Sequence, residues 1–92
     1  MVVEIEVTPT RNEHSIVFRL NLKLIPPGTG LSFANPQSAD SHPLARALFQ
    51  VKGVVSVWII GDEIQVTKDE KVRWGSVKPR IIEVIRANAN PA

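Results

Sequence analysis

The chain has 92 residues, of which 43% are hydrophobic and 22% charged, and its formal net charge is +2. These values are typical of one small globular domain and exclude an intrinsically disordered chain. The sequence contains no cysteine, which excludes disulfides, thiolate nucleophiles and metal clusters held by cysteine.

No segment is predicted to cross a membrane or to direct secretion. The longest uncharged run, residues 24–39, is interrupted by prolines and glycines and is predicted to be a loop. Met1 is followed by a strand-like segment, and not by a basic region with an apolar core. We therefore expect a cytoplasmic protein.

The beginning of the chain predicts a β-hairpin. Apolar and polar residues alternate over residues 3–7 and again over residues 16–24, which is the pattern of strands with one buried and one solvated face. Residues 8–13 are expected to form the turn between them. Pro26 ends the second strand, because proline cannot donate to the hydrogen-bond ladder.

The middle of the chain predicts a short helix. Residues 31–33 form either a brief strand or an anchor in the loop that precedes it. Ser41 is a suitable N-cap residue, and Pro43 suits the first turn. Gly53 follows the helix, where a left-handed cap or turn is expected.

A second hairpin is predicted after this helix. Residues 54–60 are rich in β-branched side chains, and residues 63–67 alternate between apolar and polar. Gly61-Asp62 lies between the two segments and is a tight-turn signal.

The last element is predicted to be a helix that Asp69 opens and that covers about residues 70–87. Its buried stripe is expected to consist of Trp74, Val77, Ile81 and Ile85. Pro79 lies in the interior of this helix, where proline costs about 3 kcal/mol. Either the helix kinks there, or a new helix starts near Lys78.

The element order β-β-α-β-β-α predicts an α+β fold built as a two-layer sandwich. We expect both helices to cover one face of an antiparallel sheet and the other face to be partly open. Residues 1–88 are expected to form a single domain, and residues 89–92 a flexible tail.

Several short motifs stand together in the second half of the chain. They are Pro43-Leu44-Ala45, Leu48-Phe49, Gly53-Val54, Ile64-x-Val66-Thr67-Lys68, Trp74 and Lys78-Pro79. Together they resemble the N-terminal domain of the Nfu/NifU-type iron–sulfur cluster scaffold proteins. The resemblance is tight over residues 43–85. It is looser before them, where residues 9–14 depart from the family's asparagine-rich turn.

In full-length scaffolds of this family, a separate C-terminal domain carries the CxxC pair that holds the cluster. This chain has no cysteine. The resemblance therefore implies a non-catalytic accessory domain that binds a partner, either the assembly machinery or an apo-target, and not the cluster itself. It implies no cofactor, and iron ion binding is expected at the level of the family only. The alternative is a generic interaction or regulatory domain with no iron–sulfur role.

Trp58 is the leading candidate for contact with a partner. If Val55, Val57 and Ile59 face the helices, Trp58 lies on the open face, because side chains alternate along a strand. The residues expected beside it on that face are Ile60, Arg19, Gln65 and Thr67. An exposed aromatic side chain among polar groups is typical of a contact patch. The alternative is a tryptophan covered by a loop or by the N-terminal strand.

The last helix also carries a basic face. Its residues are Arg73, Lys78, Arg80 and Arg86. Such a face is either simply solvated or binds an acidic protein surface. Nucleic acid is less favoured, because no exposed aromatic side chains are interleaved with the basic ones.

No metal site or catalytic site is predicted. His14 and His42 both lie in loops, and their spacing encodes no ligand set. A weak metal or small-molecule site in the loop of residues 26–42, using His42 and Asp40, is the remaining alternative. No nucleophile with a neighbouring base and no carboxylate pair stands out, so an enzyme is not expected.

Overall fold

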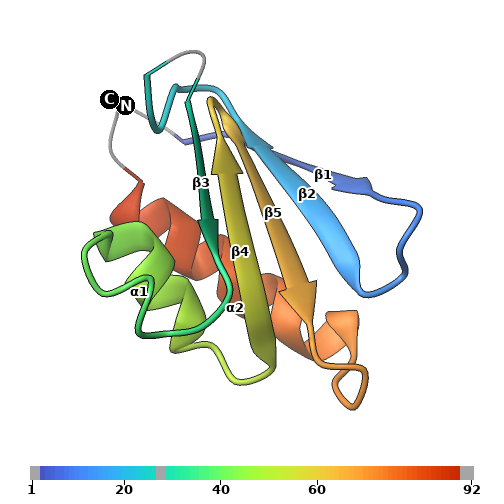
Figure 1. Ribbon diagram of the computed structural model, residues 1–92. Coiled ribbons are helices and arrows are strands. Elements are labelled where there is room, and N and C mark those ends of the chain that lie inside the picture. The colour runs from blue at the N-terminus through green and yellow to red at the C-terminus, as the bar shows by residue number, and fades with distance from the viewer. Residues whose placement is uncertain (1–2, 27–28, 90–92) are drawn as a thin grey trace.

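A computed structural model describes residues 3–26 and 29–89, and within them five strands form one antiparallel sheet with two helices packed on one face (Figure 1). In chain order the elements are β1 (Ile5–Pro9), β2 (Ser15–Leu20), β3 (Gly30–Phe33), α1 (Pro43–Phe49), β4 (Val54–Ile60), β5 (Glu63–Lys68) and α2 (Trp74–Asn88). The predicted two-layer α+β class is confirmed. The segment left open as a strand or an anchor forms β3. Most of the predicted tail lies outside the described residues.

The order of the strands in the sheet is β1-β2-β5-β4-β3. The two predicted hairpins, β1–β2 and β4–β5, are both present, and the pairing of β2 with β5 joins them. β3 adds to the free side of β4. The pairing of β2 with the central strand β5 therefore joins segments that lie far apart in the sequence.

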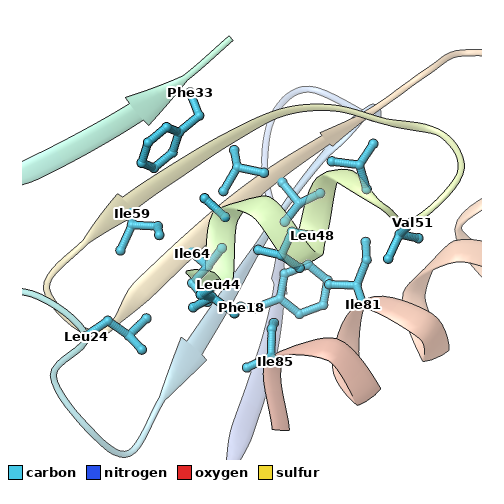
Figure 2. Close-up of a cluster of buried hydrophobic side chains, with 14 of the residues drawn as sticks. Phe18, Leu24, Phe33, Leu44, Leu48, Val51, Ile59, Ile64, Ile81 and Ile85 are labelled. Carbon is cyan, nitrogen blue, oxygen red and sulfur yellow. The ribbon is translucent and has the colours of Figure 1, made fainter. Parts of the chain in front are cut away.

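The core lies between the helices and the inward face of the sheet (Figure 2). Phe18, Ile59 and Ile64 project from three neighbouring strands and are fully buried. Leu48 of α1 and Ile81 of α2 pack against them. Each such side chain stabilises the fold by about 1.5–3 kcal/mol when it leaves water. Among the described helices, none is long and apolar enough to span a bilayer.

The second strand is shorter than predicted. β2 ends at Leu20, whereas the alternation continues to Leu24. The backbone amides of Leu20 and Leu24 donate to the carbonyls of Asp62 and Gly61, both at 2.8 Å. The chain therefore bends across the β4–β5 turn. The leucines beyond the strand still reach the core, which explains why their pattern resembles that of a strand.

The start of α1 differs by one residue from the prediction. Pro43 is the first helical residue, so the N-cap position falls on His42 and not on Ser41. The imidazole Nδ1 of His42 accepts a hydrogen bond from the amide of Ala45 at 3.3 Å, and its ring packs at a tilt on Phe33, with 5.7 Å between centroids. The ring thus fills the capping role that Ser, Thr, Asn or Asp usually takes.

The second helix starts later than predicted and is continuous. α2 begins at Trp74, and Asp69 is not its cap; the Asp69 carboxylate instead accepts from the amide of Lys71 at 2.9 Å in the preceding turn. The helix continues through Pro79, so of the two alternatives left open, that of a new helix start near Lys78 is wrong. Pro79 and the residue one turn before it, Gly75, are both exposed. Water can therefore replace the hydrogen bond that proline removes.

Candidate functional site

Among residues 3–26 and 29–89, the large hydrophobic side chains that are exposed lie on β4. Trp58 is 45% exposed, Ile60 43% and Val55 42%. On the same strand Val57 and Ile59 are buried against the helices. The structure thus places Trp58 in solvent, and not beneath a loop or the N-terminal strand.

Strand pairing extends this surface across the sheet. Trp58 lies opposite Ser32 on β3 and Gln65 on β5, and Gln65 lies opposite Val17 on β2. The neighbouring row joins Ile60, Glu63 and Arg19. We call the side of the sheet turned away from the helices the open face (Figure 1). The predicted contact residues Trp58, Ile60, Arg19, Gln65 and Thr67 all lie on it.

Val55 is the exception to the predicted alternation. It was expected to face the helices, together with Val57, but it is exposed. The register between β4 and β5 shifts between Val54 and Ser56, so Val55 is an extra residue with no partner across the ladder. This β-bulge changes the parity of the strand and adds an apolar side chain to the exposed part of β4.

Some polar side chains of the open face form ion pairs or hydrogen bonds with their neighbours. The Arg19 guanidinium lies 3.4 Å from the Asp62 carboxylate, and Lys23 lies 4.0 Å from the same group. Both cations are more than half exposed, so these pairs contribute little to stability and are free to exchange partners. Thr67 is bonded through its hydroxyl to Ser15 at 2.8 Å. The open face therefore combines exposed apolar side chains on β4 with polar groups on the neighbouring strands.

The predicted basic face of α2 is divided in two by the structure. Arg73 and Arg80 line an open hollow of ≈ 460 Å³, whereas Lys78 and Arg86 lie outside it. Two further cations, Lys52 and Lys71, line the same hollow. Sequence reasoning missed this second pair, because the lysines lie in separate loops and only the tertiary fold brings them together.

A buried lysine links the first turn of the chain to the start of α2. Lys68 is 8% exposed, and its ammonium lies 3.4 Å from Nδ1 of His14 and 5.7 Å from the centre of the Trp74 ring. The Trp74 indole donates to the carbonyl of Glu13 at 2.9 Å. A cation over an aromatic ring is attracted to it, which offsets part of the cost of burial. These contacts fix the position where the second helix begins.

The structure does not bring together the residues of the alternative metal or small-molecule site predicted in the loop of residues 26–42. His42 and Asp40 line different hollows, and the Nδ1 of His42 is bonded to the α1 backbone. Burial lowers the pKa of His42. Among residues 3–26 and 29–89, no group of three or more histidine, aspartate or glutamate side chains is placed to hold a metal ion. Part of the predicted loop, residues 27–28, lies outside those ranges.

Curated relatives match most of this chain. The NFU1 iron-sulfur cluster scaffold homolog, mitochondrial, of Drosophila willistoni is 35% identical over 81 residues, which are 88% of this chain and 28% of the relative. NifU-like protein 5, mitochondrial, of Arabidopsis thaliana is 37% identical over 81 residues, 88% of this chain and 29% of the relative. The chain thus spans less than a third of the length of these proteins.

Solved structures share the fold. A NifU-like protein of Saccharomyces cerevisiae superposes with a TM-score of 0.84 at 27% identity, over 94% of this chain and 77% of that one. A crystal structure of a Staphylococcus aureus protein superposes with a TM-score of 0.79 over 92% of this chain and 99% of that one. The second likeness, at 24% identity, shows the fold alone.

The names of the relatives correct one expectation. The predicted cytoplasmic location is wrong, because the relatives are named as mitochondrial proteins. The expectation rested on the residues after Met1. A chain that covers 27–29% of its relatives carries no information about a leader of the whole protein.

The family model described as the N-terminal part of the scaffold protein Nfu/NifU matches residues 5–91. The match spans all seven helices and strands of the described structure. The resemblance inferred from the motifs in residues 43–85 is therefore confirmed and extends over the first hairpin. This chain belongs to the Nfu/NifU N-terminal family of iron–sulfur cluster scaffold proteins.

Proposed function

We propose that this chain is a non-catalytic domain of iron–sulfur cluster assembly that binds a partner protein through the open face and does not hold the cluster itself. The observation that carries the proposal is the exposure of Trp58 on that face. The names of the relatives support a mitochondrial setting. Residues 1–88 would act as the binding module.

The chemistry of the chain supports a role beside the cluster. Iron–sulfur clusters are held mainly by cysteine thiolates, and the chain has no cysteine. The described residues gather no alternative set of three ligands. Within a scaffold family, such a domain contributes by positioning a donor or an acceptor protein.

The shape and composition of the open face support protein binding. Tryptophan is enriched among the residues that dominate binding energy, since it offers a large rigid surface and one hydrogen-bond donor. Around Trp58 lie a second apolar side chain, Ile60, and polar groups from β2 and β5, including Arg19 and Gln65. A dry centre with a polar rim is the usual anatomy of a specific interface.

Nuclear magnetic resonance tests this proposal with the chain as it exists. The labelled protein is titrated in turn with a cysteine desulfurase, a cluster scaffold and an apo-target protein, and the two indole N–H signals are followed. We expect the Trp58 signal to shift or broaden with one of them. The Trp74 signal serves as an internal control, because its indole is bonded to Glu13 inside the molecule.

The variant Trp58→Ser is expected to lose this binding, whereas Ala87→Ser, at an exposed position of α2, is a control for a surface substitution in the helix layer. Binding that survives Trp58→Ser would show that the open face is not the contact surface. A chain that binds none of the three proteins would favour the alternative of an interaction domain with no iron–sulfur role.

A further inference from the structure

The hollow that Arg73 and Arg80 line carries charged side chains of one sign only. The complete lining consists of Lys52, Lys71, Val72, Arg73, Ser76, Val77 and Arg80. Four of these seven side chains are cationic and none is acidic. Like charges that share one hollow repel one another, and a bound anion would relieve this repulsion.

The four cations are also unpaired. Within the part of the chain that the structure describes, no carboxylate forms an ion pair with any of them. The nearest acidic residue in sequence is Glu70, directly before Lys71, and it lines a neighbouring hollow and not this one. Asp69, one residue earlier, accepts a hydrogen bond at its carboxylate from the backbone amide of Lys71. All four cationic residues are exposed, so their charged groups can meet a ligand without first breaking an internal contact.

Packing beneath the hollow holds its two sides together. Gly53, directly after Lys52, has a φ of 102°, and a Cβ atom there would lie 2.7 Å from a methyl group of Val72. The carbonyl of Gly53 also accepts from the amide of Asp69 at 2.7 Å. The loop after α1 is therefore held closely against the loop before α2. This contact brings Lys52 and Lys71 to the same hollow.

We propose that this hollow, which we call the basic hollow, binds an acidic peptide segment of a partner protein. Arginine side chains can hold carboxylates through two parallel hydrogen bonds, which Arg73 and Arg80 offer here. Val72 and Val77 supply an apolar lining that fits a hydrophobic residue between two carboxylates. None of the lining residues is aromatic, so bases of a nucleic acid would find no stacking partner.

The basic hollow contains other residues than the basic face predicted from the sequence. The site combines Arg73 and Arg80 with two lysines from loops, and it leaves out the other two cations of the helix. It shares no residue with the open face and does not depend on it. A domain with both surfaces can hold two protein segments at once.

Fluorescence anisotropy tests the proposal. The probe is a labelled peptide of aspartate and glutamate with a central leucine, and the control probe replaces each acid by its amide. We expect the acidic peptide to bind and the amide peptide not to bind. Affinity should decrease as salt rises towards about 0.15 M, because the contacts are between exposed charges.

Two charge-matched variants locate the site. Arg73→Gln with Arg80→Gln removes two charges inside the basic hollow, and Lys78→Gln with Arg86→Gln removes two charges from the same helix outside it. We expect the first pair to weaken binding by about ten-fold and the second by less than about two-fold. Circular dichroism checks that both variants are folded. Trp58→Ser should leave peptide binding unchanged, which separates this proposal from that of the open face.

Three results would overturn the inference. An equal loss in both double variants would mean attraction by net charge alone. Tighter binding of a single-stranded RNA or of polyphosphate than of the acidic peptide would assign the hollow to another class of ligand. No binding of the acidic peptide even at low salt would show that the four cations are only solvated.

Discussion

The layer between the sheet and the helices differs from the open face in what its apolar side chains do. Ile59 and Ile60 are the same residue type and adjacent on β4, yet Ile59 is fully buried and Ile60 is 43% exposed. Inward side chains exclude water and set the stability of the fold. Outward ones cost solubility and contribute little to folding, which is consistent with the binding role that we propose for them.

The largest expected effect is on the inward side. Ile59→Ala should lower the free energy of unfolding by about 2–5 kcal/mol, because it leaves a cavity in the core. Ile60→Ala is the matched control and should change it by less than about 1 kcal/mol. Urea denaturation measures both. Similar losses in the two variants would break the distinction between the two sides of β4.

The next largest effect on stability is expected when Gly53, which lies at the margin of the packed layer, is replaced. Gly53→Ala should cost about 1–3 kcal/mol, since φ is 102° there and the new methyl group would meet Val72. Gly61 also has a positive φ, but a Cβ atom there would meet no atom within 4 Å. Gly61→Ala should therefore cost less than Gly53→Ala. Thermal denaturation compares the two. A larger loss at Gly61 would contradict the role given to the contact with Val72.

The cap of α1 should have a smaller effect. His42→Ala removes the acceptor of the Ala45 amide and should cost about 1 kcal/mol. His42→Asn should recover most of this, because asparagine is a strong N-cap residue. Equal stability of the two variants would show that the imidazole contributes through its packing on Phe33 instead.

Stability should also depend on pH through the same side chain. Burial lowers the pKa of His42 from 6.5, so the unfolded chain takes up a proton at a higher pH than the folded chain. The contribution of the neutral His42 side chain to the free energy of unfolding is therefore fully present above about pH 6.5 and is lost as the pH falls below that value. The loss should be smaller in His42→Asn. The free energy of unfolding is measured by urea denaturation as a function of pH. Parallel profiles of the wild-type protein and this variant would contradict a role of His42 in the pH dependence of stability.

The smallest effect on folding is expected on the open face. Trp58→Ser should change the free energy of unfolding by less than about 1 kcal/mol, although it should weaken partner binding by at least about 2 kcal/mol. Denaturation and the resonance titration measure the two quantities. A large loss of stability would show that Trp58 contributes to folding in the way that the side chains of the packed layer do.

Alternation predicted most of the sheet because a half-buried strand records its two environments in successive residues. It identified both hairpins and the face on which Trp58 lies. It failed at Val55, since a bulge adds one residue and reverses the parity without a marker in the residue type. It also extended β2 towards Leu24, where buried side chains continue the pattern after the backbone has left the sheet.

The candidate sites could be predicted only where a single element carries them. Arg73 and Arg80 were visible from the sequence because they lie seven residues apart at the start of one helix. Lys52 and Lys71 belong to separate loops, and their approach depends on the contact of Gly53 with Val72. No local pattern encodes such a contact, so the basic hollow emerged only from the fold.

The pairing of β2 with β5 has a consequence for how the chain folds. The first hairpin is synthesised early, but the edge of β2 pairs with β5, which follows β3, α1 and β4 in the chain. Closing so long a loop slows folding relative to contacts between sequence neighbours. During synthesis the apolar side of β2 also remains exposed until the helices that cover it have formed, and α2 is the last element of the chain. Phe18 and Leu20 are then the residues most open to a chaperone or to aggregation.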